Sequence, residues 1–196
     1  GYNLADVSIS DSIFEGNSSE FGGAIRVFAN PAQTCHMNVT NSEFNMNEAT
    51  SIAGGLYAYN IESVSISDST FSQNHAPRGG GMRYFAQTGT DSVLTVDGTI
   101  FKENTCVDHG GGLYADNIDV VQITNSSFHG NTSEEHGAGI YALADESIES
   151  TVAIKWTSFS QNNAASWGGG FFGNRTTQAT LTECTFENNT ADRGAG

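Results

Sequence analysis

The sequence predicts an all-β solenoid: a single-stranded parallel β-helix of about seven coils, with three short strands in each coil. The main observation is a repeat that runs through all 196 residues. Each copy joins a Phe-x-x-Asn motif to a run of glycines and small residues a few positions later. Repeats of about 20 to 50 residues are typical of solenoids, in which each unit packs against the next.

The Phe-x-x-Asn motif predicts two columns of like side chains inside the solenoid. We expect the phenylalanines to stack in the core and the asparagines to hydrogen-bond along one corner. The phenylalanines are Phe14, Phe44, Phe71, Phe101, Phe128, Phe159 and Phe186. The asparagines are Asn17, Asn47, Asn74, Asn104, Asn131, Asn162 and Asn189.

The first strand of each coil precedes the phenylalanine. Apolar residues alternate there, as at Val7 and Ile9, and this alternation is typical of a strand with one buried face. The residue three before the phenylalanine, such as Asp11 or Asn41, is mostly of a type that tolerates a left-handed turn. We therefore expect a bend at this position and a second strand that contains the phenylalanine.

The glycine run introduces the third strand. In the run at residues 79–81, as in the others, glycine lets the backbone turn tightly and pack closely against its neighbours. The next residues supply apolar side chains, such as Leu56 and Leu113, which we expect to point into the core.

These motifs resemble a known family. Phe-Glu-Gly-Asn at residues 14–17, followed by Gly-Gly-Ala-Ile at residues 22–25, resembles the repeat of the chlamydial polymorphic outer-membrane proteins and their wider relatives. The resemblance implies a right-handed β-helix at a cell surface that acts in adhesion. It implies no catalytic residues, and it makes the repeated Phe, Asn and Gly residues structural.

The repeats predict one domain, residues 1–196, that is a segment of a longer array without caps. Residues 2–7 match residues 59–64, so the chain begins inside one copy, and it ends inside another. The formal net charge of −15 argues against nucleic acid as a partner, because no basic stripe could meet phosphates. No run approaches the roughly 20 apolar residues of a transmembrane helix, so we expect no membrane insertion of this segment.

One group of polar residues could carry chemistry. It lies before the glycine runs of neighbouring coils and consists of Asp108, His109, Glu135, His136 and Trp167. Carboxylates beside histidines and a tryptophan are suited to binding a sugar or a metal, and parallel β-helices also host polysaccharide lyases and hydrolases. A solvated polar corner explains the same residues, and we favour it. The sequence therefore assigns no catalytic residue, no metal and no cofactor.

Four Asn-x-Ser/Thr sequons are candidates for glycosylation in a eukaryotic setting. The other matches at Asn17 and Asn131 coincide with the asparagine column, where a buried side chain has no room for a glycan. The four candidates are Asn38, Asn125, Asn174 and Asn188.

The uniform repeat favours a non-enzymatic, extracellular structural or adhesive rod within a larger cell-surface or filament protein. Its expected partners are neighbouring coils or copies of a similar β-helix, and a receptor or glycan on another surface. The alternative is a carbohydrate-active enzyme that uses the His/carboxylate group. Enzymes on this fold usually interrupt the repeat with long, chemically rich loops.

Overall fold

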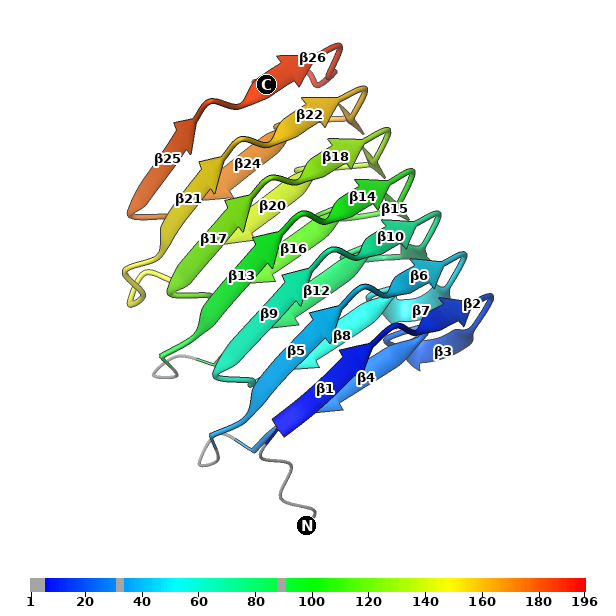
Figure 1. The fold of residues 1–196 in the computed structure, drawn as a ribbon. Coiled ribbons are helices and arrows are strands. Elements are labelled where there is room, and N and C mark those ends of the chain that lie inside the picture. Colours follow the sequence, from blue (N-terminus) through cyan, green and yellow to red (C-terminus); the bar gives the residue numbers. More distant parts are fainter. Residues whose placement is uncertain (1–5, 31–33, 88–90) are drawn as a thin grey trace.

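The protein is a solenoid of stacked coils (Figure 1). The computed structural model describes residues 6–30, 34–87 and 91–196. The match between residues 2–7 and a later coil therefore lies largely outside the described residues. Six complete coils and the first two strands of a seventh follow one another from the N-terminal to the C-terminal end of the stack.

Four parallel sheets run along the described part of the stack, and each takes one strand from every complete coil. Sheet A contains β1 (Asp6–Ser10), β5 (His36–Thr40), β9 (Ser63–Ser67), β13 (Val93–Asp97), β17 (Val120–Thr124), β21 (Thr151–Lys155) and β25 (Gln178–Thr182). Sheet B contains β2 (Ile13–Glu15), β6 (Glu43–Asn45), β10 (Thr70–Ser72), β14 (Ile100–Lys102), β18 (Ser127–His129), β22 (Ser158–Ser160) and β26 (Thr185–Glu187).

The other two sheets complete each coil. Sheet C contains β3 (Ser18–Phe21), β7 (Glu48–Ile52), β11 (His75–Ala76), β15 (Thr105–Cys106), β19 (Thr132–Ser133) and β23 (Asn163–Ala164). Sheet D contains β4 (Ile25–Phe28), β8 (Leu56–Tyr59), β12 (Met82–Phe85), β16 (Leu113–Asp116), β20 (Ile140–Leu143) and β24 (Phe171–Asn174). Sheet D lies behind sheet A in Figure 1.

The predicted parallel β-helix is confirmed, and the structure adds one short strand to each complete coil. Sheets A, B and D hold the three expected strands, while sheet C pairs the few residues between the asparagine and the glycines. Most strands of sheet C contain only two residues, which is too short for an alternating pattern to be visible in the sequence. The described residues contain no helix, and so none that could cross a membrane.

The bend between sheets A and B lies where the sequence places it. The residue three before each phenylalanine has a positive φ, from 48° at Asn41 and Asp68 to 57° at Gly98. Trp156 is the unusual member of this column, because a bulky side chain rarely adopts the left-handed conformation. Its Nε1 donates a hydrogen bond to Glu183 at 2.9 Å, which ties it to the next coil.

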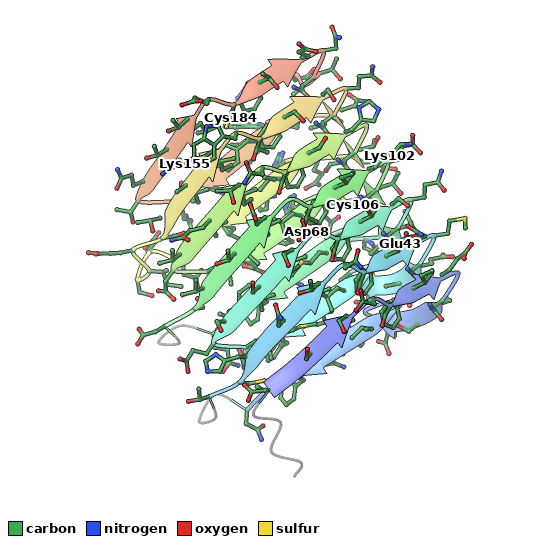
Figure 2. All side chains as sticks on the ribbon, viewed as in Figure 1. Glu43, Asp68, Lys102, Cys106, Lys155 and Cys184 are labelled. Carbon is green, nitrogen blue, oxygen red and sulfur yellow. The ribbon has the colours of Figure 1, made fainter. Side chains whose placement is uncertain are left out.

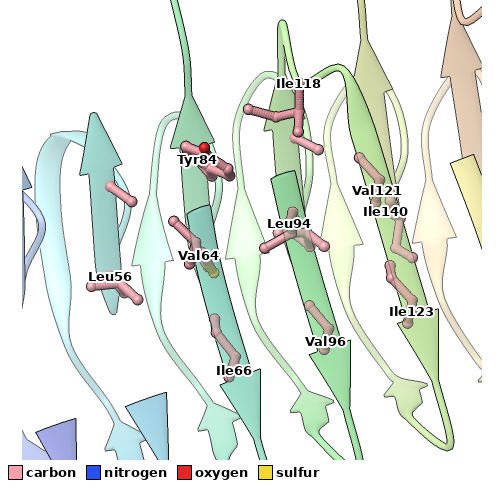
Figure 3. Packing of buried hydrophobic residues seen from close by; sticks show 14 of the residues in the cluster. Leu56, Val64, Ile66, Tyr84, Leu94, Val96, Ile118, Val121, Ile123 and Ile140 are labelled. Atoms are coloured by element: carbon pink, nitrogen blue, oxygen red, sulfur yellow. The ribbon is translucent and has the colours of Figure 1, made fainter. Parts of the chain in front are cut away.

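The phenylalanine column is one continuous stack inside the solenoid. Consecutive ring centroids from Phe14 to Phe186 are 4.6 to 5.2 Å apart, and their planes lie within 15° of parallel. This spacing equals the distance of about 4.8 Å between neighbouring strands. Aliphatic side chains of sheets A and D fill the rest of the core, among them Leu56, Val64 and Leu94 (Figure 3).

The asparagine column forms a hydrogen-bonded ladder. The Nδ2 atom of Asn74 donates to Oδ1 of Asn104 at 2.9 Å and to the backbone oxygen of Phe44 at 2.8 Å. The backbone N–H of Asn74 donates to the same Oδ1 atom at 3.0 Å. Because Oδ1 of Asn74 also accepts from the backbone N–H and Nδ2 of Asn47, this one buried amide makes four hydrogen bonds at a tight corner. The pattern recurs from coil to coil.

Candidate functional site

The outer face of sheet D differs from the rest of the exterior. Side chains on a strand alternate between faces, so the residue after each inward-pointing Leu, Met, Ile or Phe points outward. In register along the sheet these outward residues are Arg26, Tyr57, Arg83, Tyr114, Tyr141 and Phe172. By contrast, sheets A and B carry charged, exposed side chains, such as Glu43, Lys102 and Lys155 (Figure 2).

A second outward column runs beside the first on sheet D. Near the N-terminal end it is also aromatic, because Phe28, Tyr59 and Phe85 occupy equivalent positions. The ring centroids of neighbouring members are 5.1 and 5.2 Å apart. The later coils place Asp116, Leu143 and Asn174 in this column. The column therefore changes from aromatic to mixed polar along the stack.

A third column precedes the glycine runs and contains the predicted His/carboxylate group. His109 pairs in parallel register with His136, which pairs with Trp167 in the following coil. Their rings contact sheet D, since the centroid of His109 lies 4.6 Å from that of Tyr141, and the centroid of His136 lies 5.6 Å from that of Phe172. We call the following set the aromatic face: His109, Tyr114, His136, Tyr141, Trp167 and Phe172.

A pocket of about 410 Å³ opens within the aromatic face. Its walls include His109, His136, Tyr141, Trp167 and Phe172. Two further lining residues, Glu135 and Asn174, add a carboxylate and an amide to an otherwise ring-lined cavity. A concave surface that combines aromatic rings with a few convergent polar groups is a usual form of a ligand site.

The two histidines lie parallel at one side of this pocket. Their ring centroids are 5.0 Å apart and their planes differ by 4°. Nδ1 of His109 lies 3.6 Å from Oε2 of Glu135, and the Nδ1 atoms of both rings are buried without a hydrogen-bond partner. Burial, followed by the proximity of His136, lowers the pKa of His109 below its ordinary value, which favours the neutral ring.

The structure brings four of the five predicted residues together and directs the fifth elsewhere. His109, Glu135, His136 and Trp167 line the pocket. Asp108 instead accepts a hydrogen bond at 2.8 Å from Nε of Arg78, in the preceding coil. Its carboxylate is therefore committed to an ion pair outside the pocket lining.

Sequence reasoning missed an ion pair on the outer face of sheet D. Arg83 donates to Asp116 from neighbouring strands, and their side chains are only 9% and 6% exposed. The guanidinium carbon of Arg83 also lies 4.9 Å from the ring centroid of Tyr114. Burial raises the pKa of Asp116, and Arg83 opposes this effect. The recurrence of large residues one position after each inward residue was the signal for this surface.

The four sequons lie at or near the surface. Asn38 is exposed on β5, and Asn188 is exposed at a turn with a φ of 54°. Nδ2 of Asn125 donates to Oδ1 of Asp97 at 2.8 Å. Nδ2 of Asn174 donates to the hydroxyl of Tyr141 at 3.0 Å, beside the pocket. Their glycosylation stays a prediction.

One comparison with known proteins gave a match. Residues 11–27 match the model of the Chlamydia polymorphic membrane protein (Chlamydia_PMP) repeat. The chain is a β-helix with a polymorphic-membrane-protein-like repeat. The matched stretch contains Phe14 and Asn17, which begin the stack and the ladder that continue through the later coils.

Searches of curated proteins and of solved structures gave no match. The polymorphic-membrane-protein-like repeat suggests a surface-associated protein. The matched residues 11–27 do not include the aromatic face.

Proposed function

We propose that this polymorphic-membrane-protein-like chain is a non-enzymatic, extracellular adhesive rod that binds a glycan through its aromatic face. The rod is one segment of a larger cell-surface or filament protein. The observation that carries the proposal is the line of aromatic side chains beside a polar pocket on the outer face of sheet D.

The chemistry of the face suits a carbohydrate. The C–H groups of a sugar ring pack against aromatic faces, and Trp167, which is 39% exposed, offers such a surface with a polar N–H at its edge. The carboxylate of Glu135 and the amide of Asn174 lie in the same pocket and could bind sugar hydroxyls. Strands repeat about every 4.8 Å along the stack, close to the length of one sugar unit, so a chain could follow the solenoid axis.

The two tryptophans provide a matched test. Trp167 lines the pocket and is 39% exposed, while Trp156 lies at the bend between sheets A and B and is 53% exposed. On an array of immobilised glycans, we expect Trp167→Ala to weaken wild-type binding by about tenfold or more, equivalent to about 1.4 kcal/mol. Trp156→Ala should bind as the wild type does.

Three results of this test would contradict the proposal. They are a wild-type chain that binds no glycan on the array, a Trp167→Ala variant with unchanged binding, and equal losses in the two tryptophan variants. Circular dichroism of each variant verifies that the β-helix is retained, so that a loss of binding is not a loss of fold.

A carbohydrate-active enzyme is the second candidate, and the cluster of His109, Glu135 and His136 in the pocket favours it. The glycans that bind on the array can be incubated with the chain while new reducing ends or unsaturated sugars are measured. Cleavage that His109→Ala and His136→Ala abolish would identify an enzyme. Binding without cleavage supports the adhesive rod.

A further inference from the structure

Two buried ring nitrogens in the pocket have no hydrogen-bond partner. They are the Nδ1 atoms of His109 and His136. A buried polar atom that is left without a partner costs about 1 to 3 kcal/mol, so native structures contain few of them. Two equivalent atoms in neighbouring coils are therefore available to one shared ligand.

The surroundings of these atoms favour a cation. Glu135 directly precedes His136, and its carboxylate oxygen lies 3.6 Å from Nδ1 of His109. One ligand atom from each of His109, Glu135 and His136 lies within 4.8 Å of the other two. The three residues thus hold two imidazole nitrogens and one carboxylate oxygen close together, in a chain whose net charge is −15.

We propose that His109, Glu135 and His136 bind one divalent transition-metal ion, and that Zn²⁺ fits these ligands best. Zn²⁺ accepts imidazole nitrogen and carboxylate oxygen together, whereas Ca²⁺ and Mg²⁺ prefer oxygen ligands alone. Three protein ligands leave the fourth tetrahedral position open toward the pocket. The inference does not depend on glycan binding.

Binding one ion requires only side-chain movements. Ligand atoms around tetrahedral Zn²⁺ are about 3.3 Å apart, given bond lengths of about 2.0 to 2.1 Å. The pair of His109 and Glu135 is already at 3.6 Å, and no separation in the cluster exceeds 4.8 Å, so the ligand atoms must approach by at most about 1.5 Å. Because the two imidazole planes are parallel, one ring must also rotate before both nitrogens face the same ion. Glu135 is exposed and can rotate, while the register of β-bridges holds the two histidine backbones in place.

The backbone supports this geometry on both sides. The backbone N–H of His136 donates to the oxygen of Asp108 at 3.1 Å, which fixes the two histidine-bearing segments together. The backbone oxygen of Glu135 accepts from Ser166 at 2.9 Å. Two of the ligands therefore come from one segment and the third from the adjacent coil, so a bound ion would cross-link the two coils.

Titration of the full chain with Zn²⁺ tests the proposal. We expect isothermal titration calorimetry under reducing conditions to detect one bound ion for each chain. His136→Ala and His109→Ala should each weaken binding by more than the roughly 10- to 100-fold that loss of a supporting residue costs. The matched control is His75→Ala, because His75 is exposed and its Nδ1 is already hydrogen-bonded to Thr105.

Two further measurements separate the site from other causes. Glu135→Gln changes an exposed side chain, retains the fold and should still weaken Zn²⁺ binding. Co²⁺ bound in place of Zn²⁺ should show visible absorption bands of a tetrahedral site without the intense near-ultraviolet band of a thiolate ligand, which excludes the cysteines. Wild-type binding no tighter than that of the His109→Ala/His136→Ala double variant, or unchanged binding in Glu135→Gln, would overturn the proposal.

Discussion

Sheets A and D have similar interiors but different exteriors. Both direct apolar side chains inward, such as Val64 and Ile66 from sheet A and Leu56 from sheet D. The central outward column of sheet A consists of short or polar residues in register: Ser8, Asn38, Ser65, Thr95, Gln122, Ala153 and Thr180. The corresponding column of sheet D is aromatic or basic.

This difference separates what the fold requires from what it only permits. In stacked coils, each inward side chain must pack against the equivalent side chains of the coils above and below. The inward residues of both sheets are therefore apolar. An outward position has no such requirement, and sheet A shows that short polar side chains suffice there. The aromatic residues on sheet D therefore need another explanation. Burial of Tyr57, Tyr114 and Tyr141 assigns those rings to a second packed layer, and the exposed Trp167 leaves a surface available for binding.

The largest expected effect concerns the interior that the two sheets share. Phe101 is fully buried between Phe71 and Phe128, at centroid distances of 4.9 and 4.8 Å. Phe101→Ala should lower the free energy of unfolding by about 3 to 5 kcal/mol, because it leaves a cavity in the stack. Ile100→Ala, at a position 43% exposed on the same strand, should change it by about 0.5 kcal/mol or less. Urea denaturation measures the free energy of unfolding of both variants. Similar losses in the two would contradict the prediction that only the inward position is essential to the stability of the stack.

An intermediate effect tests whether the exterior of sheet D acts as a second packed layer. Tyr114 points outward but is buried by Arg83 and by neighbouring rings. We expect Tyr114→Ala to cost about 2 to 3 kcal/mol, the value of a buried large side chain. Gln122→Ala, at an exposed outward position on sheet A, should be nearly neutral. Thermal and urea unfolding measure the loss of stability in each variant. Equal losses in Tyr114→Ala and Gln122→Ala would show that the two exteriors contribute equally to stability, which would contradict the prediction.

The smallest expected effect concerns the polar exterior of sheet A. Asp97 accepts hydrogen bonds from the side chains of Thr124 and Asn125, in that order of importance, and these lower its pKa below the ordinary value of 3.8. A lowered folded-state pKa stabilises the protein above the unfolded-state pKa, and this stabilisation disappears as the pH falls through the folded-state value. Asp97→Asn should therefore be less stable than the wild type at neutral pH, and the difference should narrow below a pH of about 4.

Urea unfolding of the two proteins at several pH values measures this difference. The group is largely solvated, so screening should keep the effect small at every pH. If the stability difference between the wild type and Asp97→Asn grew as the pH fell, the hydrogen bonds to the Asp97 carboxylate would not be its cause.

Much of the fold was predictable because a solenoid converts sequence position into spatial position. Coils of nearly constant length place equivalent residues directly above one another. The motif containing Phe14 and Asn17 therefore predicted both columns of the interior, and the recurring Asp or Asn before it predicted the bend between sheets A and B. Sheet C was missed because its strands are too short to carry a period.

The candidate site was only partly predictable. Its histidines share one repeat position, so their proximity followed from the register. The pairing of Asp108 with Arg78 was not foreseen, since it depends on where each side chain turns after the backbone is placed. Arg83 and Asp116 form a buried pair from neighbouring columns on adjacent coils, and no periodic pattern connects the two residues.

The sequence by itself thus determined the solenoid, its interior stack and ladder, and the grouping of His109 with His136. The tertiary structure alone decided that the outward column of sheet D joins this group around one pocket and that two imidazole nitrogens are buried there without a partner. The physical reason is that repetition specifies which residues become neighbours across coils. Burial and hydrogen bonding depend on the volume and direction of all the side chains around them.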